Sequence, residues 1–85
     1  MTNKLESLKK KILYRSLYRG TKEMDLLLSN FVKSKINCLD ISDLEDLLFF
    51  LNLEDEDIYA FYQNNQINEK IPNNKITSMF KDYKL

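Results

Sequence analysis

The stretch YRGTKEMD contains the only glycine in a chain of 85 residues and places it among charges. Arg19 directly precedes Gly20, Glu23 follows three residues later, and Arg15 lies on the N-terminal side of the same stretch. Charged side chains of this kind recognise polar groups of other molecules through charge-assisted hydrogen bonds. Local helix chemistry accounts for them as well, because a glycine commonly ends one helix and lets another begin. The stretch is therefore either a helix junction or a surface shaped to meet another molecule.

The residues that carry out covalent catalysis are scarce in the rest of the sequence. Histidine, the commonest general base near neutral pH, is absent. Cys38 is the only cysteine, so a zinc site lacks its usual ligands and no internal disulfide can form. We expect Cys38 to be a small buried hydrophobe. A single glycine cannot supply the glycine-rich nucleotide-binding motifs. These absences predict that the protein is not an enzyme and that it binds no metal and no cofactor of its own.

Length and hydropathy predict one small domain, residues 1–85, with no membrane insertion. No apolar run approaches the roughly 20 residues that a membrane span needs. The three lysines at 9–11 interrupt what would be the apolar core of a signal peptide, and the N-terminal stretch fits a transit peptide poorly. We therefore expect a cytoplasmic location.

The charges balance overall but are distributed unevenly. Residues 1–22 hold seven basic residues and one acid, for a charge of +6, whereas residues 38–57 hold eight acids and no base, for −8. These segments are either solvated faces that attract each other in the fold or a polarised surface that orients a partner. The two interpretations are compatible. A net charge of zero and the acidic segment argue against binding to nucleic acid, which needs a dominant positive face.

The apolar residues recur with helical spacing almost throughout the chain. Met24, Leu27, Leu28 and Phe31 fall at i, i+3, i+4 and i+7, and similar stripes occupy 44–51 and 76–83. The pattern predicts an all-α fold, a compact five-helix bundle with helices near 3–18, 21–35, 42–52, 55–64 and 74–84.

Capping residues mark several of the expected helix ends. Gly20 is expected in the left-handed conformation at the end of the first helix, with Thr21 as the N-cap of the second. Arg19 and Glu23 would then complement the dipoles of the two helices. Two pairs have capping-box spacing, Asn3 with Glu6 and Ser42 with Glu45.

Residues 15–31, RSLYRGTKEMDLLLSNF, resemble the signature of the SdhE family. These are small assembly factors that promote covalent FAD attachment to the flavoprotein subunit of succinate dehydrogenase. The R-G-x-x-E motif of the family matches Arg19, Gly20 and Glu23, and its following acidic residue matches Asp25. The resemblance covers residues 13–61 and includes the acidic junction DEDI at 55–58.

The resemblance implies a chaperone-like role. Family members bind the flavoprotein subunit in an arrangement that favours bond formation between FAD and a histidine of that subunit. The partner-binding surface would consist of Arg15, Arg19, Gly20, Glu23 and Asp25. FAD would be held by the partner subunit and not by this chain. The resemblance leaves open whether fumarate reductase is also a partner. A generic helical adaptor without a role in flavin attachment would show the same stripes and caps.

Overall fold

The structure is a computed structural model that describes residues 4–17, 19–64 and 69–83. The described residues form five α-helices and one 3₁₀ turn, and they contain no strand. In chain order these are α1 (Lys4–Arg15), α2 (Lys22–Lys35), the turn η1 (Ile36–Cys38), α3 (Ile41–Leu51), α4 (Asp55–Asn64) and α5 (Lys75–Asp82). The all-α, five-helix prediction is confirmed.

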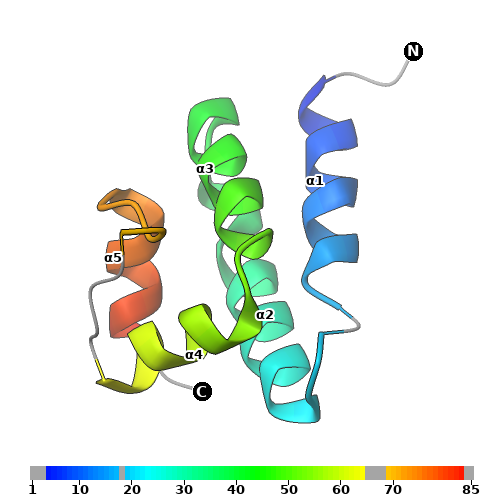
Figure 1. Cartoon of the computed structure of the whole chain (residues 1–85). Coiled ribbons are helices and arrows are strands. Elements are labelled where there is room, and N and C mark those ends of the chain that lie inside the picture. Colours follow the sequence, from blue (N-terminus) through cyan, green and yellow to red (C-terminus); the bar gives the residue numbers. More distant parts are fainter. Residues whose placement is uncertain (1–3, 18, 65–68, 84–85) are drawn as a thin grey trace.

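The helix α3 lies between α1 and α5 and packs against both of them (Figure 1). The helix α1 also contacts α2, and α4 crosses one end of the molecule and contacts α5. The radius of gyration, 12.3 Å, is close to the value of about 12 Å expected for a compact chain of this length. The bundle is therefore compact, with α1 on one side of α3 and α5 on the other.

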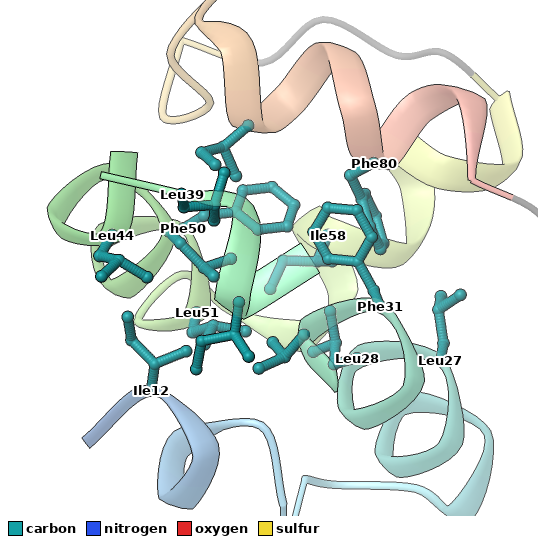
Figure 2. Packing of buried hydrophobic residues seen from close by; sticks show 14 of the residues in the cluster. Ile12, Leu27, Leu28, Phe31, Leu39, Leu44, Phe50, Leu51, Ile58 and Phe80 are labelled. Atoms are coloured by element: carbon teal, nitrogen blue, oxygen red, sulfur yellow. The ribbon is translucent and has the colours of Figure 1, made fainter. Parts of the chain in front are cut away.

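The apolar stripes predicted from the sequence face one core. Leu28 and Phe31 of α2, Phe50 of α3 and Phe80 of α5 are completely buried and lie together in Figure 2. Phe80 is surrounded by aromatic rings, with centroid distances of 5.1 Å to Phe31, 5.0 Å to Phe50 and 5.1 Å to Tyr62. These rings join α2, α3, α4 and α5, so the core depends on side chains far apart in the sequence.

The first helix is shorter than the spacing predicts. It ends at Arg15 rather than near residue 18. Ser16, which is buried, turns its hydroxyl back to donate to the carbonyl of Leu13 at 2.7 Å. Such a local side-chain bond competes with helix continuation. The expected cap at Asn3 lies outside the described residues.

The connection between α2 and α3 also differs from the prediction. The N-cap of α3 is Asp40, whose carboxylate accepts from the amide of Asp43, and not Ser42. Cys38 is exposed, so the expectation that it is buried is wrong. Ile36, the first residue of the 3₁₀ turn, and Leu39, which follows the turn, are buried, whereas Cys38 faces outward.

The last helix has a capping box that the sequence analysis did not identify. Asn74 accepts from the amide of Thr77 at 3.0 Å, and the hydroxyl of Thr77 accepts from the amide of Asn74 at 3.0 Å.

In the described part of the chain, no helix is long and apolar enough to cross a membrane.

Candidate functional site

The side chain of Arg19 lies inside the fold, at the meeting point of α1, α3 and α4. Its guanidinium donates to the backbone carbonyls of Arg15 at 2.9 Å and Leu51 at 2.7 Å, and more weakly to Leu53 at 3.3 Å. It also forms a two-pronged contact with Asp55, with Nε at 2.8 Å and Nη2 at 2.6 Å from the same carboxylate oxygen. Only 11% of the Arg19 side chain is exposed. Arg19 thus satisfies the carbonyls that end α1 and α3, a role suited to a planar group with five donors.

The second oxygen of Asp55 binds the backbone beside Arg19. The amide of Gly20 donates to this oxygen at 2.7 Å. A Cβ built on Gly20 would lie 3.1 Å from the same oxygen, closer than ordinary van der Waals contact. The absence of a side chain at Gly20 therefore lets Asp55 approach the backbone.

The predicted reason for this glycine is wrong in its detail. The φ angle of Gly20 lies outside the left-handed region, and α1 has already ended at Arg15. Close approach of a carboxylate, and not a left-handed helix end, is what this position requires. Asp55 itself is the first residue of α4.

The start of α2 is held by two further contacts in the same place. The hydroxyl of Thr21 accepts from the amide of Met24 at 3.2 Å, which confirms the predicted N-cap. The carboxylate of Asp25 accepts from the amide of Arg19, so it ties the connection back onto α2. We name the set Arg19, Gly20, Asp25 and Asp55 the motif corner. Its members fix the direction in which α2 leaves the α1–α2 connection.

Glu23 and Arg15 face outward from the motif corner. Glu23 is exposed in the first turn of α2, and its carboxylate is 3.5 Å from the hydroxyl of Tyr59 on α4. Arg15 is exposed at the end of α1, and its side chain lines the hollow beside Gly20 and Asp55. This hollow has a volume of about 530 Å³. The structure thus brings all five predicted site residues into one corner, where Arg19, Gly20 and Asp25 bond to the fold itself and Arg15 and Glu23 have exposed side chains.

Sequence reasoning did not single out Asp55 as a site residue, although the acidic segment that contains it was noted. Asp55 is separated from Arg19 by 36 positions, and no local pattern records the contact between them. The one available signal is the opposite charge of the two segments that contain these residues. A segment with a charge of −8 and one with +6 should attract each other, but this attraction does not identify which residues form a pair.

Comparison with known families identifies the chain. The family described as flavinator of succinate dehydrogenase (Sdh5) matches residues 10–84, which is most of the chain and contains the whole motif corner. The protein therefore belongs to this family, and the resemblance recognised in residues 15–31 is confirmed.

Two curated relatives carry the same description, "Succinate dehydrogenase assembly factor 2, mitochondrial". The one from Arabidopsis thaliana is 35% identical over 69 residues, covering 80% of this chain and 37% of the relative. The one from Dictyostelium discoideum is 42% identical over 57 residues, covering 67% of this chain and 40% of the relative. The chain thus spans well under half the length of these two relatives. The search of solved structures found no significant match.

Proposed function

We propose that this protein is an assembly factor that binds the flavoprotein subunit of succinate dehydrogenase and promotes covalent attachment of FAD to it. The observation that carries the proposal is the family match over residues 10–84. The names of the two relatives support it, because both refer to succinate dehydrogenase assembly. The fumarate reductase flavoprotein is a second candidate partner. Specific binding to duplex DNA is not expected.

In this function the protein acts by position and contributes no reacting atom. The bond forms between FAD and a side chain of the flavoprotein subunit, and both reactants belong to the partner. Holding a partner in a productive arrangement can lower a barrier by several kcal/mol. The rigid contacts of the motif corner suit such a role, because they present the first turn of α2 in one fixed direction.

The geometry suggests two different tasks within the proposed partner-binding surface. Arg19, Gly20 and Asp25 bond to the fold itself and would shape the surface. Glu23 and Arg15 are exposed and would touch the partner. Glu23 is therefore the cleaner residue for testing contact, and Arg19 for testing shape.

The test is coexpression with the flavoprotein subunit in cells that lack their own factor, followed by in-gel fluorescence of covalent flavin. We expect Glu23→Gln to leave the melting temperature within about 2 °C, because it removes one exposed charge, and to reduce covalent flavin strongly. The matched control is Glu69→Gln, since Glu69 is exposed in the connection before α5. If a stably folded Glu23→Gln variant gives undiminished covalent flavin, Glu23 does not contact the partner and serves only to complement the dipole of α2.

The competing function is a generic helical adaptor, which would bind its partner without changing flavin attachment. The same assay separates the two, because an adaptor gives equal covalent flavin with and without its expression.

The cytoplasmic location expected from the sequence also stays a prediction, and the two relatives are described as mitochondrial. Fractionation of the organism's cells would test it.

A further inference from the structure

A groove runs along the outer side of α1 and α3 towards the motif corner. Two hollows, of about 640 Å³ and 530 Å³, share Tyr14, Arg15 and Asn52 in their walls. They therefore form one continuous depression from the middle of α1 to the first turn of α4. We name it the α1–α3 groove.

Large apolar side chains are exposed along this groove. Tyr14 is 68% exposed and lines both hollows, and the partly exposed Leu17 lines the one nearer to Gly20. Phe49 is 55% exposed and lines neither hollow, but it lies one helical turn before Asn52, beside the groove. Aromatic side chains left in water at one place on a small protein mark a binding surface, because they are the usual anchors of protein interfaces.

The half of the groove beside the middle of α1, which we call its upper half, is positively charged. Lys10, Lys11 and Arg15 line the larger hollow, and no carboxylate is among its lining residues. In the described part of the chain, the side chains of these three residues make no hydrogen bond or ion pair. The other α1 lysines are engaged, Lys4 with Glu45 of α3 and Lys9 with Asn37.

The lower half of the groove is acidic, and this difference restricts what can bind. Glu54, Asp55 and Glu56 line the smaller hollow together with Arg15 and Arg19. Asp55 is bound to Arg19, so Glu54 and Glu56 supply its acidic character. A nucleic acid or an anionic membrane would bring negative charge against these acids as well as onto the lysines. A protein segment can vary its charge along its length and meet both halves. Charge complementarity therefore favours a protein partner with an acidic stretch beside an apolar side chain.

We propose that the α1–α3 groove is a docking surface for an acidic segment of the flavoprotein partner that carries an aromatic or aliphatic side chain. Acidic groups of this segment pair with Lys10, Lys11 and Arg15, and its apolar side chain packs between Tyr14 and Phe49. The groove continues into the motif corner, so one partner covers both. This inference rests on the proposed function, which supplies the partner.

The test is the dissociation constant between this chain and the purified, FAD-loaded flavoprotein subunit, at low and at physiological salt. We expect the double variant Lys10→Glu, Lys11→Glu to bind about tenfold or more weakly at low salt, with a smaller loss as salt rises. The control is Lys33→Glu, Lys81→Glu, which changes the net charge equally on α2 and α5, away from the groove. It should bind within about threefold of the unmodified chain.

The apolar contact is tested separately. We expect Phe49→Ser to weaken binding about tenfold or more, because an exposed aromatic anchor loses its packing against the partner. Ile41→Ser is the control, since Ile41 is exposed at the opposite end of the same helix. Circular-dichroism melting of all variants establishes that each is folded at the assay temperature.

The outcomes separate this inference from the function on which it rests. If the unmodified chain does not bind the flavoprotein subunit, both the docking surface and the proposed function are overturned. If it binds and the groove variants match their controls, the docking surface is overturned and the proposed function stands.

Photocrosslinking identifies the occupant. With the photocrosslinker p-benzoylphenylalanine in place of Phe49, the crosslinked peptide should come from an acidic stretch of the flavoprotein subunit. A crosslink to a non-acidic stretch would overturn the charge argument. A crosslink to residues 40–57 of a second copy of this chain would show that the groove serves self-association instead.

Discussion

The motif corner and the aromatic cluster around Phe80 hold the same bundle together by different means. The cluster joins α2, α3, α4 and α5 through ring contacts, and Phe31, Phe50 and Phe80 are fully buried within it. The motif corner joins α1, α2, α3 and α4 through oriented hydrogen bonds at a partly exposed position. Apolar burial is non-directional and contributes most of the stability. Oriented bonds to a charged group contribute less and determine direction. The comparison indicates that the cluster keeps the protein folded and that the corner sets the shape of its candidate surface.

The largest effect on stability is expected from Phe80→Ala. Removing this ring leaves a cavity against Phe31, Phe50 and Tyr62, and such losses cost about 3–5 kcal/mol. Urea unfolding followed by circular dichroism measures the free energy of unfolding. A loss below about 1 kcal/mol would show that α5 does not depend on the cluster.

Comparing the stability losses of Leu28→Ala and Leu48→Ala tests how far the hydrophobic core extends. Leu28 is completely buried, and Leu28→Ala should cost about 2–5 kcal/mol. Their positions in the apolar stripes predict the same loss for both, but the structure places Leu48 half-buried in the wall of the α1–α3 groove. Leu48→Ala should therefore cost only about 1 kcal/mol. Equal losses in urea unfolding would extend the core to this groove.

At the motif corner we expect Arg19→Ala to cost about 1–3 kcal/mol, because the carbonyls of Leu51 and Leu53 and the Asp55 carboxylate lose a donor. This exceeds the 0.3–1 kcal/mol or so of a charge that only complements a helix dipole. Arg19→Lys should recover only part of the loss, since an ammonium cannot reproduce the fork.

The control for Arg19 is the exposed pair between Lys4 and Glu45, whose side chains are 75% and 56% exposed. Lys4→Ala should change stability by less than about 0.5 kcal/mol in the same denaturation experiment. Comparable losses for Lys4→Ala and Arg19→Ala would remove the distinction between the corner and an ordinary surface pair.

At the motif corner, Gly20→Ala should cost less than Arg19→Ala, about 0.5–1.5 kcal/mol, because the new Cβ pushes the Asp55 carboxylate out of its favoured position. A double-mutant cycle sharpens this prediction. In an Asp55→Ala background the added methyl group meets no carboxylate, so the cost of Gly20→Ala should nearly vanish. If the losses of Gly20→Ala and Asp55→Ala are additive, the cost of Gly20→Ala comes from the backbone at this position and not from the contact with Asp55.

Periodicity was enough to predict the elements and most of the core. Met24, Leu27, Leu28 and Phe31 were read as one stripe, and all four are buried. Helical spacing is a local property, so it is visible in a single sequence. The end of α1 was less predictable, since it depends on where one serine hydroxyl donates.

The composition of the candidate site was predictable, but its internal contacts were not. Charges at Arg19 and Glu23 are visible in the sequence, whereas their different exposures depend on how α3 and α4 pack against the connection. Three of the partners of Arg19 are backbone carbonyls, which every residue possesses. No residue pattern records such a contact. The proposed function rests on the similarity of the motif and its surroundings to a family.

The hydrogen bond between the Gly20 amide and Asp55 spans 35 positions, whereas the one from the Arg19 amide reaches Asp25 only 6 positions away. The two adjacent amide protons therefore report different events in hydrogen exchange. Separation of α4 from the connection exposes the Gly20 proton to solvent and leaves the Arg19 proton protected. Loss of the local turn exposes the Arg19 proton first. Two neighbouring signals in one NMR spectrum thus distinguish the detachment of a helix from the fraying of a loop, without any added label.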